Sequence, residues 1–199
     1  MARDSGRNFT RERIAHLAAR LMAEDGIEDY ALAKRKAARQ AGIAETRQLP
    51  NNDEIEAALK IYRTLYQRQH PAQLRELRQL ALQVMDELAE FNPYLTGSVL
   101  KGHAGKYATI HLQLFTDSGK NVEHYLLNHD TRFKSDELRL YSGDRAISAP
   151  VLTFERDNVE INMTLLSTRD LRTQLKTSPE GKPIERAKRA AVETLIAAD

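Results

Sequence analysis

The sequence predicts an α+β protein, in which an N-terminal helical unit precedes a small mixed or antiparallel sheet with flanking helices. Apolar residues recur at about 3.6-residue spacing as far as residue 92, which is the period of an α-helix. Beyond Pro93 they alternate with period two, which is typical of strands. We therefore predict a helical region over residues 1–92 and an α/β region over residues 93–199.

Composition indicates a globular chain without a membrane anchor. Of the 199 residues, 41% are hydrophobic and 29% are charged, and the net charge is only +2. The sequence shows no run of about 18 apolar residues and no secretory signal pattern, so we expect a cytoplasmic protein. Cysteine is absent, which excludes disulfides, thiolate metal sites and cysteine nucleophiles.

Four helices are predicted in the helical region, because each apolar stripe is bounded by a capping residue, a glycine or a proline. These helices run from Thr10 to Gly26, from Asp29 to Ala41, from Asn52 to about Tyr66, and from Pro71 to Asn92. The residues up to Asn8 are expected to be frayed.

The densest positive patch of the helical region lies on the second of these helices, at Lys34, Arg35, Lys36 and Arg39. A solvated helix face is one interpretation, and contact with nucleic acid is the other. The order of helices here is similar to the helix-turn-helix of tetracycline-repressor-type regulators. The segment that would read bases, 44–49, is cut short by Pro50.

The α/β region is predicted to contain a sheet of about five strands. The expected strands lie at 110–115, 122–127, 138–141, 151–155 and 159–165, with turns at 117–120 and 157–158. The first two would form a hairpin, and so would the last two. Ser167 opens a short helix through a capping box, and the last helix carries an apolar stripe from Ile184 to Leu195.

One stretch combines glycines, a hydroxyl and a following strand. Gly97 and Ser98 end a short apolar entry, and Lys101 and Gly102 close a short helix after them. A glycine lets the backbone turn sharply, and exposed amides together with a hydroxyl suit a phosphate group. We therefore predict phosphate binding at Gly97, Ser98, Lys101 and Gly102.

This layout resembles the nucleotidyltransferase fold of DNA polymerase beta type, over residues 71 to 167. In that family the Gly-Ser turn holds a triphosphate, and carboxylates on later strands hold two metal ions. The resemblance implies that Thr109 and His111 stand where the paired aspartates would be, and that Glu160 stands at the third acidic position. Mg²⁺ requires carboxylate oxygen, so we expect no metal site and no cofactor, with Mg²⁺ relevant only to an active enzyme.

Three functions follow from these features. The first is a non-catalytic nucleotidyltransferase-like protein that binds a nucleotide, another phosphate ligand or a protein partner in a regulatory role. The second is a nucleic-acid-binding regulator that uses the basic N-terminal helices. The third is an active nucleotidyltransferase with relocated carboxylates, for which Asp117, Glu123 and Glu160 are the candidates.

Overall fold

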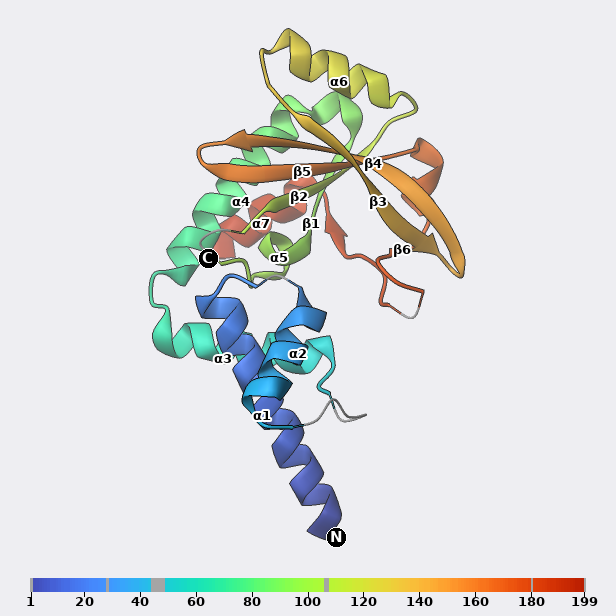
Figure 1. Cartoon of the computed structure of the whole chain (residues 1–199). Helices are drawn as coiled ribbons and strands as arrows, with labels where there is room; N and C mark the ends of the chain where they lie inside the picture. Colours follow the sequence, from blue (N-terminus) through green and yellow to red (C-terminus); the bar gives the residue numbers. More distant parts are fainter. Residues whose placement is uncertain (1, 28, 44–48, 106–107, 180, 199) are drawn as a thin grey trace. The chain divides into compact units, whose positions relative to one another are not determined.

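The computed structural model describes the chain except for residues 1, 28, 44–48, 106–107, 180 and 199 (Figure 1). The chain divides into two compact units. Unit 1 comprises Met1–Gln73 and Gly105–Tyr107, and unit 2 comprises Leu74–Ala104 and Ala108–Asp199. The fold class is mixed α and β, as predicted, with helices in the N-terminal part and a seven-stranded mixed sheet in unit 2.

Three helices build unit 1 around an apolar core of their own: α1 (Ala2–Glu24), α2 (Tyr30–Gln40) and α3 (Asn52–Tyr66). Ile14 of α1 and Ile55 and Leu59 of α3 are fully buried. The residues that α2 buries are alanines, whose small side chains let helices approach closely. As predicted, Asp29 caps α2, since its carboxylate accepts hydrogen bonds from the first-turn backbone.

Two predicted helix starts in unit 1 are wrong. Helix α1 begins at Ala2 rather than after Thr10, because the segment contains no proline and its one glycine costs only about 1 kcal/mol in a helix. Helix α3 is capped by Asn51 rather than Asn52, through a capping box in which Asn51 and Glu54 bond each other's backbone N–H. Of the expected base-reading segment, residues 44–48 lie outside the described part of the chain.

Helix α4 (His70–Glu87) starts in unit 1 and continues into unit 2. The remaining helical elements belong to unit 2 and include two 3₁₀ turns: η1 (Ala89–Phe91), α5 (Gly97–Lys101), α6 (Gly119–Asn128), η2 (Thr168–Arg172) and α7 (Arg189–Ala198). Its strands are β1 (Pro93–Thr96), β2 (Ile110–Phe115), β3 (Lys134–Ser142), β4 (Arg145–Arg156), β5 (Val159–Leu166), β6 (Leu175–Lys176) and β7 (Arg186–Ala187).

The sheet has the strand order β6-β3-β4-β5-β2-β1-β7 (Figure 1). Strand β2 pairs antiparallel with β1 and parallel with β5, so the centre of the sheet is mixed. The predicted hairpin of 151–155 and 159–165 is confirmed as β4 and β5, and the expected strand at 138–141 lies within β3. The parallel pairing of β2 with β5 requires a long crossover, which α6 and the β3–β4 hairpin provide.

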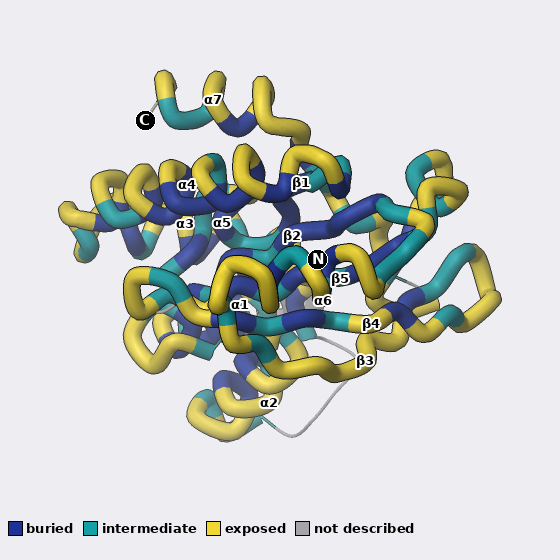
Figure 2. Tube along the Cα trace, turned by 90° about the horizontal axis from the view of Figure 1, so that it is seen from above, coloured by how far each residue is buried: buried dark blue, intermediate teal, exposed yellow. Residues whose placement is uncertain are grey.

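One face of this sheet is apolar and covered by helices. Leu95, Leu112 and Ile161 from the three central strands pack against side chains of α4, α6 and α7. The alternation predicted for β2 is confirmed, because Ile110, Leu112 and Leu114 share this covered face. Figure 2 shows the central strands largely buried and β3 largely exposed. Within the described residues, no helix has both the length and the apolar character needed to cross a membrane.

The strand predicted at 122–127 is wrong, since these residues lie in α6. Val122 and Leu126 are buried four residues apart, and His124 between them is exposed, which is the periodicity of a helix. The hairpin expected with 110–115 is therefore absent, and β5 takes the place beside β2.

The C-terminal helix also differs from its prediction. It begins at Arg189, because Arg186 and Ala187 form strand β7 beside β1 instead of the first turn of a helix. With β1, β6 and β7 added and 122–127 removed, the sheet has seven strands instead of about five. The capping box at Ser167 is confirmed, and it opens the 3₁₀ turn η2.

Candidate functional site

The Gly97–Ser98 turn lies where β1 ends and α5 begins. Gly97 has a φ of +74°, a left-handed conformation that glycine adopts without strain. A Cβ atom at this position would lie 3.1 Å from Cδ2 of His111, so a side chain here would also require the imidazole to shift. Gly102, with a φ of +82°, closes α5 as predicted.

Ser98, the second residue of α5, carries a buried hydroxyl. Its Oγ is buried and makes no hydrogen bond within the part of the chain that the structure describes. A buried hydroxyl without a partner costs free energy, about 1–3 kcal/mol in mutational data. Lys101 lies in the last turn of α5 and is exposed.

Thr109, His111 and Glu160 lie at the same end of the sheet as this turn. His111 pairs with Thr96 across β1 and β2, directly before Gly97. Thr109 Oγ1 donates to Glu160 Oε1 at 3.4 Å. The structure therefore brings Gly97, Thr109, His111 and Glu160 to one end of these strands.

Polar side chains continue from this edge across five strands, and we refer to them as the polar row. Directly paired residues point to the same face of a sheet, so the registers of β7, β1, β2, β5 and β4 place these side chains in one line. The members of the polar row are Arg186, Thr96, His111, Asn162 and Thr153. Within the row, Thr153 Oγ1 donates to Asn162 Oδ1 at 2.6 Å.

Two cations lie at the β7 end of the polar row. The Arg186 guanidinium stands 5.0 Å from the ring centroid of Phe115 and 5.5 Å from that of Tyr94, and it donates to the carbonyl of Leu171. Lys188 Nζ lies 5.6 Å from the Tyr94 ring. Aromatic faces attract cations electrostatically, which holds the Lys188 charge over Tyr94 and the Arg186 charge over Tyr94 and Phe115, towards the C-terminal end of β2.

The donors and acceptors of this site do not suit Mg²⁺. The polar row offers hydroxyl, imidazole, amide and guanidinium groups, whereas Mg²⁺ binds carboxylate oxygen in octahedral geometry. Glu160 is exposed and stands opposite Glu155 in the β4–β5 register. Among the residues that the structure describes, no group of three His, Asp or Glu side chains is placed to hold a metal ion.

The relocated carboxylates considered above are not brought together. Asp117 follows the C-terminal end of β2, whereas Glu160 stands beside the N-terminal end of that strand. Asp117 Oδ1 accepts from Thr168 Oγ1 at 2.5 Å, and Glu123 lies on α6. A two-metal centre built from these three side chains is not formed.

Sequence reasoning missed Thr96, Thr153 and Asn162. The period-two alternation of 159–165 places Asn162 on a polar face, which is a usable signal. Which residue then stands beside His111 depends on the parallel pairing of β2 with β5, and that pairing joins strands 44 positions or more apart in the sequence.

The basic residues of unit 1 are divided between two environments. Arg35, Lys36 and Arg39 are exposed on the side of α2 away from its buried alanines. Lys34 is half-buried, and its Nζ donates to Asn52 Oδ1 at 2.7 Å. Burial lowers the pKa of Lys34.

Comparison with known proteins returns no relative: no family model matches this chain, no curated protein matches it, and no solved structure matches it.

Proposed function

We propose that unit 2 is a nucleotidyltransferase-like domain without metal-dependent transfer, which binds a nucleotide or another phosphate compound in a regulatory role. The observation that carries this proposal is the polar row, which begins beside the Gly97–Ser98 turn and holds a guanidinium but no carboxylate. Hydroxyl, amide and guanidinium donors suit a phosphate anion and do not suit a metal.

The order of elements supports the nucleotidyltransferase part of this proposal. A helix, a short strand, the Gly-Ser turn, a short helix and a second strand follow one another as α4, β1, α5 and β2. The residue matched to the second aspartate, His111, contacts the turn, and the one matched to the first, Thr109, reaches Glu160.

The same positions argue against catalysis. Transfer of a nucleotidyl group by two metal ions needs carboxylates that bridge both ions. A hydroxyl at Thr109 and an imidazole at His111 carry no negative charge, and Glu160 is a single carboxylate. We therefore expect binding without chemistry, which is the property of a regulatory domain.

Phosphate would be held by donors on both sides of the turn. The Ser98 hydroxyl makes no hydrogen bond to the described residues, and the residue as a whole is partly exposed. Arg186 pairs with Thr96 through its backbone, and its guanidinium lies over Tyr94 and Phe115, so a ligand at the turn would reach this charge by extending along β1. A charge-assisted hydrogen bond is roughly twice as strong as a neutral one.

Phosphorus-31 NMR of nucleoside triphosphates titrated with the full chain tests the proposal. Ser98→Ala should weaken binding by about 1.5 kcal/mol, the scale of a hydrogen bond to a charged group, and Arg186→Met should weaken it further. Arg145→Met is the matched control, because Arg145 is exposed at the far end of β4. Unchanged phosphorus signals at millimolar protein would refute the proposal.

Unit 1 supports a second candidate function. Arg35, Lys36 and Arg39 present three cations on one exposed helix face, which suits the phosphates of nucleic acid. Fluorescence anisotropy with duplex DNA at several salt concentrations tests it. Replacement of all three residues by alanine should weaken binding and reduce its salt dependence, by a slope of about 0.9 for each lost phosphate contact.

A further inference from the structure

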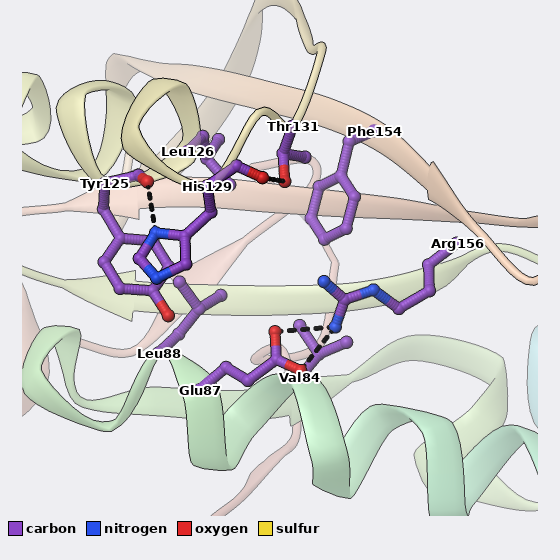
Figure 3. A pocket seen from close by; sticks show the side chains of 9 residues that line it. All are labelled: Val84, Glu87, Leu88, Tyr125, Leu126, His129, Thr131, Phe154 and Arg156. Atoms are coloured by element: carbon purple, nitrogen blue, oxygen red, sulfur yellow. Dashed lines mark hydrogen bonds and ion pairs between the residues drawn. The ribbon is translucent and has the colours of Figure 1, made fainter.

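A cavity of about 320 Å³ opens on the helix-covered face of the unit 2 sheet, and it shares no residue with the polar row (Figure 3). Side chains of α4 and α6 and the end of β4 surround it. Val84, Leu88, Leu126 and Phe154 give it an apolar lining. Its volume lies near the lower end of the range for small-molecule sites, about 300–1,000 Å³.

One wall carries a guanidinium with unused donors. Arg156 Nη1 donates to both carboxylate oxygens of Glu87 at 2.6 Å. Its Nε and Nη2 make no hydrogen bond to the described residues, and the second terminal nitrogen points toward the cavity in Figure 3. Glu87 neutralises the charge of Arg156. The cavity wall therefore offers N–H donors to a ligand but carries no net positive charge.

The opposite wall carries an acceptor. The rings of Tyr125 and His129 are stacked, with centroids 4.1 Å apart. His129 Nδ1 lies 2.8 Å from the Tyr125 carbonyl oxygen, which can only accept, so Nδ1 bears the proton. In the neutral imidazole Nε2 is then an acceptor, and within the described chain it has no partner.

The charges and hydrogen-bonding groups of the two walls determine which kind of aromatic ligand fits the cavity. An aromatic hydrocarbon would bury Arg156 Nη2 and His129 Nε2 without partners, at a cost for each group. An aromatic anion would meet the carboxylate of Glu87, which Arg156 only neutralises. A neutral ring with one acceptor and one N–H donor would satisfy both walls, and its faces would pack on the aromatic side chains.

We infer that this cavity binds a planar, uncharged heteroaromatic ring of the nucleobase type, between Tyr125–His129 on one side and Phe154–Arg156 on the other. A ring acceptor receives the free N–H of Arg156, and an amino N–H attached to the ring donates to His129 Nε2. The inference stands apart from the phosphate proposal, because the two sites lie on opposite faces of the sheet.

Nitrogen-15 NMR of the full chain, titrated separately with adenosine, cytidine and benzoate, tests the inference. A nucleoside should shift the backbone amides of Tyr125, Leu126, His129 and Thr131, and benzoate should not. His129→Phe, which keeps the stack but removes Nε2, should raise the nucleoside Kd about tenfold, and so should Arg156→Met. His124→Phe on the exposed side of α6 and Arg145→Met on β4 are the controls and should leave it unchanged.

A short single-stranded oligonucleotide distinguishes two sources of the ligand. If it shifts these amides less than the nucleoside does, the ligand is a free nucleoside. If the oligonucleotide shifts them more, the ligand is a base of a nucleic acid. Three results would overturn the inference. The first is a nucleoside that leaves all four amides unshifted at millimolar concentration. The second is tighter binding of benzoate, strengthened by Glu87→Gln. The third is a folded His129→Phe protein with unchanged affinity.

Discussion

Ser98 is a residue at which stability and binding are expected to move in opposite directions. Its Oγ is buried without a partner among the described residues. Ser98→Ala removes this unsatisfied group, so the free energy of unfolding of unit 2 should rise by about 1 kcal/mol while phosphate affinity falls. Chemical denaturation of the variant measures the first effect. Ser135→Ala, at an exposed position of β3, is the control, and a loss of stability at Ser98 would show that the hydroxyl is satisfied after all.

Gly97 should be intolerant of a side chain for two separable reasons. Its φ is +74°, and a Cβ atom would lie 3.1 Å from His111. Gly143, with a φ of +60° and no atom within 4 Å of the same position, shares the backbone constraint alone. Gly143→Ala should cost about 1–2 kcal/mol, and Gly97→Ala should cost more, because His111 must also move. Equal losses of thermal stability in Gly97→Ala and Gly143→Ala would mean that the His111 side chain moves away without cost.

The residues of the site show what the sequence can reveal. Gly97, Ser98 and Gly102 were predicted correctly as a turn and a helix end, because glycine in a left-handed conformation is a local property. Thr96, Thr153 and Asn162 were not predicted, because their part in the site depends on strand register. Register is set by pairing between distant segments and not by local sequence.

Among the helices and strands, the caps of α2 and α3 are predictable to within one residue, whereas the start of α1 and the element at 119–128 are not. Asp29 caps α2 as expected, and α3 is capped by Asn51 instead of the predicted neighbour Asn52. Residues 122–127 are short and apolar enough for either a strand or a helix, and periodicity cannot decide between the two over six residues. The packing of Val122 and Leu126 into the core under the sheet decides for the helix.

Two adjacent leucines of α6 should contribute very differently to the stability of unit 2. Leu126 is buried in the unit 2 core, whereas 61% of Leu127 is exposed. Leu126→Ala should lower the free energy of unfolding by about 2–5 kcal/mol, and Leu127→Ala should change it by less than about 0.5 kcal/mol. Urea denaturation of both variants measures the difference. Comparable losses would contradict the placement of this helix.

In each unit, ion pairs join elements that are distant in the sequence. In unit 1, Arg11 Nε lies 2.7 Å from Glu54 Oε1, and in unit 2, Arg189 pairs with Asp86. Hydrogen bonds from these arginines lower the pKa of Glu54 below its ordinary value of 4.5 and that of Asp86 below 3.8.

The lowered pKa values of Glu54 and Asp86 determine how the free energy of unfolding changes with pH. A carboxylate whose pKa is lower in the folded state stabilises the fold above its unfolded pKa, and this stability is lost as the pH falls through the folded value. The free energy of unfolding should therefore decline below about pH 4.5. Glu54→Gln and Asp86→Asn should each make that decline shallower in urea denaturation, and an unchanged slope in both variants would refute a role for these pairs.

We propose that the unit 2 site binds a phosphate compound without a metal ion. Calorimetric titration of the full chain with nucleoside triphosphates, in EDTA and again in Mg²⁺, tests this claim most directly. We expect binding in EDTA, with an affinity that Mg²⁺ does not increase, because the polar row contains no carboxylate. Binding that appears only with Mg²⁺, accompanied by release of pyrophosphate, would contradict it.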